Sequence, residues 1–354
     1  MARELDELIK QPSEWLRGAG PVSDIVISSR TRLARNLEKY PFATRATKES
    51  QGEVLQVVKE GLAHCGTLIH PLLVDIGELD EVDRLFLVER HLVSREHIVH
   101  ADHKAVAIGR GEITSIMINE EDHLRVQVMQ SGMNLADAWS LIDKLDDELS
   151  EALPYAYSSD WGYLTCCPTN TGTGMRASVM LHLPSLVITK QINKVLHTIT
   201  KLGLTARGLF GEGTEASGNF FQISNQVSLG RPEEDIIENL SRILKEVIHQ
   251  EQAARESLIS HNRVQLEDRI WRAFGILRHA KTISSTEALD LLSAVRLGVD
   301  LNLMNGSINR TTVNELFIFS QPAHLQKLEG KALSAKERDA KRAELVRNRL
   351  GGQA

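Results

Sequence analysis

The chain has 354 residues, of which 42% are hydrophobic and 25% charged, and its formal net charge is −6. This composition is typical of globular proteins, and the length allows two domains with a core each. The negative charge argues against a dedicated nucleic-acid-binding protein, and no uncharged apolar run of about 18 residues predicts a membrane span.

The cysteines and the N-terminus predict a cytoplasmic protein. Cys166 and Cys167 are adjacent and Cys65 is distant, so the odd count with no framework spacing indicates a reducing compartment. The first residues are acidic and lack the apolar segment of a signal peptide. Neither a CxxC pair nor an HExxH motif occurs, so we expect no protein-bound metal such as zinc.

Hydrophobic periodicity predicts an α+β fold for the first two thirds of the chain. After a helical lead-in over residues 1–20, helical spacing of apolar residues predicts helices at 47–65, 79–93, 134–153 and 192–202. Alternating, β-branched segments predict strands at 24–27, 105–108, 113–118, 124–129, 163–166, 178–183, 205–209 and 219–224. Strands with helices packed on them indicate an α+β domain with an antiparallel sheet.

The sequence pattern changes from mixed to helical after Pro232, a residue that suits a first helical turn. One long helical pattern runs from there to about residue 261, and no convincing strand follows it. We therefore predict a lead-in over residues 1–23, a mixed domain over 24–255 and an all-α domain over 256–354.

Residues 167–178 (CPTNTGTGMRAS) combine a thiol, a glycine-bearing loop and an arginine. Glycines let a backbone approach a ligand closely, and the planar guanidinium of Arg176 matches phosphate oxygens. Nearby positive charge would favour the thiolate of Cys167. By itself the segment is also compatible with a turn that contains a buried cysteine.

Three further segments place arginines or carboxylates in or beside likely loops. In residues 28–35 (SSRTRLAR), Arg30 and Arg32 alternate, so both project to one side of an extended chain. Residues 119–125 (NEEDHLR) place carboxylates and an arginine at the end of an apolar strand, where catalytic groups tend to lie. Residues 207–215 (RGLFGEGTE) form a glycine-rich loop that matches neither a P-loop nor a dinucleotide-binding fingerprint. An exposed strand edge and an acidic hairpin turn are the alternatives for the first two.

Together these segments supply five arginines, two carboxylates and one thiol. Converging arginines would hold a polyphosphate and spread the charge of a transferring phosphoryl group, and the carboxylates should then face a cationic acceptor. The two carboxylates with this role are Glu121 and Glu212, since a carboxylate can orient a guanidinium and accept its proton.

The four segments, in this order, resemble the signature motifs of the phosphagen (guanidino) kinases. The resemblance covers roughly residues 24–231 and implies ATP and Mg2+ as cofactors, direct in-line transfer of the γ-phosphoryl group, and Glu121, Glu212 and Cys167 as catalytic residues. It assigns residues 24–255 as the catalytic domain. The nucleotide-binding residues that it implies are Ser28, Ser29, Arg30, Thr31, Arg32, His91, Arg125, Arg176, Ala177, Ser178, Val179, Met180, Arg207, Gly208 and Gly211.

The layout departs from that of kinases for small guanidines. Only 27 residues precede Ser28, whereas a helical extension follows the catalytic core. This arrangement is similar to the bacterial branch of the family that phosphorylates arginine side chains of proteins. Residues 338–343 (RDAKRA) match the phosphoarginine-binding element of that branch, which implies a regulatory site at Arg338, Asp339, Arg342 and Ala343. An ordinary basic helix is the alternative.

The resemblance implies partners and competing functions. The partners are protein substrates with exposed arginines, including a heat-shock repressor, an activator protein, the Clp protease that degrades the marked proteins in the stress response, and a second copy of the chain. No membrane and no nucleic acid is expected as a direct partner. The alternatives are a kinase for free arginine or a related small guanidine, and a non-catalytic reader of phosphoarginine.

Overall fold

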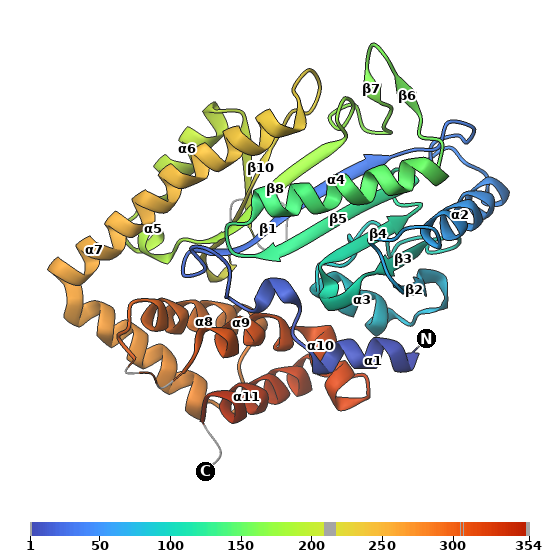
Figure 1. The fold of residues 1–354 in the computed structure, drawn as a ribbon. Coiled ribbons are helices and arrows are strands. Elements are labelled where there is room, and N and C mark those ends of the chain that lie inside the picture. Colours follow the sequence, from blue (N-terminus) through green and yellow to red (C-terminus); the bar gives the residue numbers. More distant parts are fainter. Residues whose placement is uncertain (1, 209–216, 305, 307, 352–354) are drawn as a thin grey trace.

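The computed structural model describes residues 2–208, 217–304, 306 and 308–351. Within them the centre of the molecule is an eight-stranded antiparallel sheet of order β2-β3-β4-β5-β1-β8-β10-β9 (Figure 1). Its strands are β1 (Val26–Arg35), β2 (Leu72–Asp75), β3 (Ala105–Ile108), β4 (Thr114–Ile118), β5 (Leu124–Ser131), β8 (Met175–His182), β9 (Leu204–Gly208) and β10 (Phe220–Asn225). A separate hairpin of β6 (Tyr157–Ser158) and β7 (Gly162–Tyr163) projects beyond it.

Helices flank the sheet and form the C-terminal part of the chain. The α-helices are α1 (Ala2–Lys10), α2 (Lys48–Leu62), α3 (Glu81–Glu89), α4 (Leu135–Ala152), α5 (Pro184–Ile188), α6 (Ile192–Lys201), α7 (Glu233–His279), α8 (Ser285–Asp300), α9 (Arg310–Phe319), α10 (Pro322–Glu329) and α11 (Ala335–Gly351). Short 3-10 turns are η1 (Glu14–Leu16), η2 (Ile76–Glu78), η3 (Arg110–Glu112) and η4 (Ser217–Asn219). No described helix is long and apolar enough to cross a membrane.

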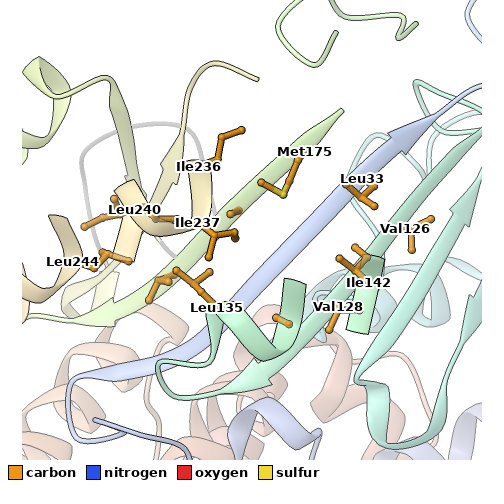
Figure 2. Packing of buried hydrophobic residues seen from close by; sticks show 14 of the residues in the cluster. Leu33, Val126, Val128, Leu135, Ile142, Met175, Ile236, Ile237, Leu240 and Leu244 are labelled. Atoms are coloured by element: carbon orange, nitrogen blue, oxygen red, sulfur yellow. The ribbon is translucent and has the colours of Figure 1, made fainter. Parts of the chain in front are cut away.

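One face of the sheet is covered by helices along its length. Leu33 of β1 and Val126 and Val128 of β5 belong to the same apolar cluster as Leu135 and Ile142 of α4 (Figure 2). Residues of α2, α6 and the first half of α7 complete that cluster. Successive side chains of a strand point to opposite faces of the sheet. The residues that alternate with these buried apolar residues therefore point toward the other face.

The opposite face is covered only at its ends. Ile27, Met129, Met180 and Phe220 pack with the C-terminal helices, while Met117 and its neighbours pack with α3. The middle of this face, between the two apolar clusters, opens into a cleft.

Helix α7 joins the sheet to the C-terminal helices. Its first half packs in the sheet's cluster and its second half in the cluster of α8, α9 and α11. Near the middle, Glu251 accepts hydrogen bonds from the backbone of α5, and Arg255 donates to Asp24 at 3.1 Å. The backbone leaves helical geometry only at Asn262. The predicted helix ends near residue 261, but burial of Leu266 and later residues continues it to His279.

The predicted α+β class with an antiparallel sheet and a helical C-terminal part is confirmed. The predicted strand at 163–166 is wrong beyond Tyr163, because the backbone N–H of Cys166 binds the Asp122 side chain instead of a neighbouring strand. Sequence periodicity missed β2 and α5, which are only four and five residues long. The domain bounds stay a prediction.

Candidate active site

The open face of β1 carries the two predicted arginines. Ser28, Arg30 and Arg32 alternate with Ser29 and Thr31, which point toward the helix-covered face. The Ser29 hydroxyl lies against the start of α4, where it donates to the carbonyl of Gly132 at 2.8 Å. The prediction that Arg30 and Arg32 share one side of an extended chain is confirmed.

Strand register brings the other arginines to the same face. Arg176 of β8 lies directly opposite Arg32, and Arg125 of β5 lies opposite Ala34, two residues along β1. On the far side of β10, Arg207 lies opposite Gln222. Since directly opposed residues of antiparallel strands point to one side, four strands deliver five guanidinium groups to one surface.

These groups surround a cleft of about 480 Å³. The lining residues are Arg30, Arg32, Val88, His91, Val93, Ser94, Arg95, Glu96, Met117, Arg125, Gln127, Arg207, Gly208 and Gln222. Arg176 lies beside this lining and donates to the Ser224 hydroxyl at 3.2 Å. Ser224, Gln222 and Gln127 were not found from the sequence, because isolated polar residues on strands carry no motif.

The arginines repel one another. Burial, and then Arg125 and Arg176, lower the pKa of Arg30 to about 10. Burial, and then Arg30, Arg125 and Arg176, lower the pKa of Arg32 well below its usual value. The Nε atom of Arg32 is buried and has no hydrogen-bond partner among the described residues. Crowded cations and a buried donor without a partner are costly, so the cleft fits a ligand with several negative charges.

Glu120 holds one arginine in place. Its carboxylate accepts from Arg125 at 2.7 Å and from the Ser94 hydroxyl at 2.6 Å. Burial alone would raise its pKa, but Arg125 and the hydrogen bonds lower it to about 2. Glu120 is therefore a charged positioning group. The sequence did not distinguish it from its neighbour Glu121.

His91 lies at one end of the cleft, beyond Arg30. Its backbone has a φ of 60°, and its carbonyl accepts from Gln127 at 2.8 Å. Its ring lies edge-on to Trp15 with centroids 5.4 Å apart. Trp15, Ser28, Ser178 and Met180 line a small cavity with His91 that adjoins the cleft. Trp15 was missed, because its lead-in segment resembles no site motif.

Glu121 and Cys167 do not line the cleft, but Glu121 lies close enough to Arg125, and Cys167 close enough to Arg176, to interact electrostatically with these arginines. One carboxylate links their two loops, since Asp122 accepts from the backbone N–H of Cys166 and from Asn36, both at 2.7 Å. Burial, and then Asp122 and Glu120, raise the pKa of Glu121. Asp122 and Asn36 thus fix two loops that lie 44 residues apart in the sequence.

The loop that follows Cys167 is held closely to the sheet. Gly174 has a φ of 66°, and a Cβ there would come within 2.6 Å of the Ala34 carbonyl. Gly172 has a φ of 106°, and a Cβ there would come within 2.7 Å of the Cα atom of Leu229. Ser228 donates to the carbonyls of this loop at 3.0 Å. The glycines therefore serve close backbone packing here.

Some predicted residues do not enter the cleft. Ser29, Thr31, Ala177 and Val179 place their side chains on the helix-covered face, because they alternate with the residues that line the site. Glu212 and Gly211 lie outside the described residues. Among the described residues, no group of three or more His, Cys, Asp or Glu side chains could hold a metal ion.

The predicted phosphoarginine element lies in α11, remote in sequence from the cleft. Arg342 is buried and donates to the carbonyls of Ser320 and Ile283, both at 2.8 Å, and to Asp339 at 2.6 Å. Ala343 is buried in the C-terminal cluster. Arg338 is partly exposed and donates to the carbonyl of Leu333. Of these residues, Arg338 is the one best placed to meet a ligand.

Comparison with known proteins identifies the family. Residues 53–254 match the ATP:guanido phosphotransferase C-terminal catalytic domain, and residues 263–354 match the C-terminal domain of the protein-arginine kinase McsB. A protein-arginine kinase of Halothermothrix orenii is 49% identical over 98% of both chains, and one of Desulforamulus reducens is 47% identical over the same shares. The chain belongs to the protein-arginine kinase family of ATP:guanido phosphotransferases.

Solved structures support the same fold. The duplicated taurocyamine kinase of Schistosoma mansoni, with bound transition-state analogue components, has a TM-score of 0.60 at 27% identity, over 69% of this chain and 35% of that one. A lombricine kinase has a TM-score of 0.58 at 24% identity, over 72% and 78%. As a phosphotransferase of the protein-arginine kinase family, the protein uses ATP as a substrate.

Proposed function

We propose that this protein transfers the γ-phosphoryl group of ATP to the guanidinium group of arginine side chains in proteins. The observation that carries the proposal is the arrangement of groups along β1. Trp15 and His91 lie at one end, the five arginines lie in the middle, and Glu121 and Cys167 lie outside the cleft lining, near Arg125 and Arg176 respectively. This order matches a nucleobase, a polyphosphate and a cationic acceptor in a line.

The arginines would bind the phosphates and stabilise the transition state. Arg30, Arg32 and Arg125 supply positive charge from fixed positions on a sheet, so little reorganisation is needed as charge develops. Their mutual repulsion falls when phosphate oxygens lie between them. The site is therefore complementary to the triphosphate before it binds.

The acceptor step needs a base, since a guanidinium is protonated and a poor nucleophile. A guanidinium nitrogen forms a bond to the γ-phosphorus, the bond from that phosphorus to the bridging oxygen breaks, and ADP leaves. The nitrogen's proton passes to the carboxylate of Glu121, whose raised pKa makes it a better proton acceptor. We assign Glu212 a second contact to the guanidinium, as the resemblance implies. Cys167 would favour the cation electrostatically, without a covalent intermediate.

We propose Mg2+ as the companion of ATP. Mg2+ is commonly held by substrate phosphates and only one or two carboxylates, which fits a cleft that has many arginines and few acidic side chains. When bound, it would neutralise charge on the phosphates.

The two candidate functions differ in the molecule that accepts the phosphoryl group, which is either an arginine side chain of a protein or a small guanidine. The relatives at 47–49% identity are named protein-arginine kinases, which favours a protein side chain. The solved taurocyamine and lombricine kinases favour a small guanidine, but they are more distant. We prefer the protein acceptor.

The deciding experiment offers the protein ATP with either unfolded casein or free L-arginine. We expect phosphoarginine on casein, detected by mass spectrometry at neutral pH because the N–P bond is labile in acid. Phosphorylation of free arginine alone would support the small-guanidine kinase. If ATP is not consumed, or is consumed equally by Glu121→Gln, the non-catalytic reader would be favoured.

We also propose the cellular setting that the resemblance implies. The marked proteins, including a heat-shock repressor, would pass to a Clp protease in the stress response, and an activator protein and dimer formation would control the kinase. Arg338 and Asp339 would bind phosphoarginine as a regulatory ligand. Loss of phosphoarginine binding in Arg338→Ala, with the fold intact, would support that assignment.

A further inference from the structure

The hairpin of β6 and β7 displays two large aromatic side chains. Tyr157 is 63% exposed and Trp161 is 57% exposed, and both lie within a few residues of the turn. The hairpin projects past the edge of the sheet, on the side away from the C-terminal helices (Figure 1). Exposed aromatics that serve neither the core nor the cleft are typical of binding surfaces.

The base of the hairpin is rigid because Arg35 anchors it. The Arg35 guanidinium is 3.5 Å from the centroid of the Tyr163 ring and is held by Asp146 at 2.7 Å. Tyr163 in turn contacts Tyr157 edge-on, with centroids 5.3 Å apart. The aromatic surface is therefore fixed by a buried ion pair.

The same anchor connects the hairpin to the acceptor end of the site. Arg35 also donates to the carbonyl of Thr173 at 2.9 Å, within the loop that follows Cys167. The backbone N–H of Tyr163 donates to the carbonyl of Gly172 at 2.8 Å. The hairpin and the Cys167 loop are thus one hydrogen-bonded unit.

The number of residues between Trp161 and Cys167 limits how long a ligand must be to contact both the hairpin and the acceptor end of the site. Trp161 precedes Cys167 by six residues, so their Cα atoms are at most about 22 Å apart. An extended peptide of about six residues is long enough to cover even this maximum distance. Asp160, beside Trp161, is exposed and adds a negative charge that complements a basic segment.

We propose that Tyr157 and Trp161 bind the polypeptide segment that flanks the acceptor arginine in a protein substrate. This inference rests on the proposed function and names how its substrate is held. Aromatic rings supply a large contact area that tolerates many sequences, and they attract flanking lysine and arginine side chains through cation–π contacts. The occupant is an extended, basic segment of an unfolded or loosely folded protein.

The test measures initial rates with unfolded casein and ATP, each varied separately. In the double variant Tyr157→Ala/Trp161→Ala we expect the KM for casein to rise by about tenfold, as is usual when central interface aromatics are truncated. The KM for ATP and the kcat at saturating casein should stay within about twofold, because neither aromatic residue lines the nucleotide cleft. Trp161→Phe should retain most of the affinity for casein.

The matched control is Trp271→Ala, which removes an exposed aromatic of α7, 41% exposed and outside the site. It should leave the KM for casein unchanged. The docking proposal is overturned if the double variant keeps the wild-type KM for casein, if its KM for ATP rises equally, or if sedimentation shows that it lost a dimer contact instead. Failure of the wild-type protein to phosphorylate casein would count against the proposed function itself, and the docking proposal would fall with it.

Discussion

The environment of Arg32 destabilises the ligand-free protein. It is half-buried, lies opposite Arg176 and leaves its buried Nε atom without a hydrogen bond among the described residues. Like charges directly opposite each other destabilise a sheet, and a buried donor atom without a hydrogen bond adds to the cost. A ligand with several negative charges would remove both penalties.

We therefore predict opposite effects for Arg32→Met with and without ligand. Free of ligand, the variant should be more stable than the wild type by about 1–2 kcal/mol, since an unbranched apolar chain replaces an uncompensated charge. Inorganic tripolyphosphate should stabilise the wild type and not the variant. Urea unfolding measures both effects. Equal stabilisation of both proteins by tripolyphosphate would contradict the assignment of the cleft.

Glu121 and Glu120 are adjacent and should differ in kinetics. Glu121→Gln should lower kcat by about 10²–10⁴, the usual contribution of a general base, without unfolding the protein. Its control, Glu120→Gln, should mainly raise the KM for ATP, because Glu120 positions Arg125. Steady-state rates of phosphoarginine formation separate the two. Normal turnover in a folded Glu121→Gln variant would refute its role.

The pH profile belongs to the same prediction. The base must be ionised, so activity should increase as the pH rises through the pKa of Glu121. Burial and the neighbouring carboxylates raise that pKa, which moves the acid limb of kcat above the usual range for glutamate. The limb should be absent from the residual activity of Glu121→Gln.

The cysteines should differ in reactivity. Burial, and then a hydrogen bond to Glu148, raise the pKa of Cys65 to about 11, so little thiolate forms there at neutral pH. We expect iodoacetamide at pH 7 to modify Cys167 before Cys65, as peptide mass mapping will show. Cys167→Ser should lower activity strongly but not abolish it, whereas modification at Cys65 alone should be tolerated. Inactivation that follows Cys65 would contradict this site map.

Among the elements, the end of α3 connects the cleft to the lead-in and to α10. Arg90 is buried and pairs with Glu112 and with Ser13 of the lead-in. Glu89 accepts from the backbone of His324 at the start of α10, at 2.9 Å. His91, the next residue along the chain, lines the cleft. The C-terminal helices therefore help to hold one wall of the cleft proposed to bind the nucleotide.

This connection predicts coupled effects on stability and binding. Glu112→Gln leaves the Arg90 cation buried without its partner, which typically costs about 3–5 kcal/mol. The same variant should raise the KM for ATP, because the pair supports His91. Arg90→Met/Glu112→Leu should recover much of the stability, since it removes both charges. Urea unfolding and ATP titrations provide the measurements. A double variant less stable than Glu112→Gln would argue against the buried-charge explanation.

At the scale of the whole molecule, buried histidines make the fold sensitive to acid. Burial lowers the pKa of His97 to about 4 and that of His91 to about 3, and it lowers the pKa of His182 well below its usual value. In the unfolded chain these groups titrate near 6.5, so below that pH the unfolded state binds more protons than the folded state.

Stability should therefore be fully present above about pH 6.5 and fall as the pH drops toward 4. Each of these histidines contributes about 1.4 kcal/mol per pH unit in that window. Urea midpoints measured between pH 7 and 5 test this, and His97→Gln should flatten the dependence. Stability that is flat over this range in the wild type would show that the histidines are not the cause.

Local sequence patterns were enough to predict the class of the fold and the groups that we propose for the chemistry. Alternation at Arg30 and Arg32, the acidic turn at Glu121 and the thiol loop at Cys167 are local patterns, and their residues keep those relations in the structure. Periods of two and about four residues also located most strands and helices, because local burial imposes them. The strand at residues 163–166 failed because a distant side chain, Asp122, determines that backbone.

How these segments meet became visible only in the folded protein. The pairing of Arg32 with Arg176, the link through Asn36 and Asp122, and the position of Trp15 beside His91 each join residues more than 70 positions apart. Such contacts depend on strand order and register, which no local pattern encodes. Local patterns thus specified the groups that we propose for the chemistry, and long-range packing decided which of them face one cleft.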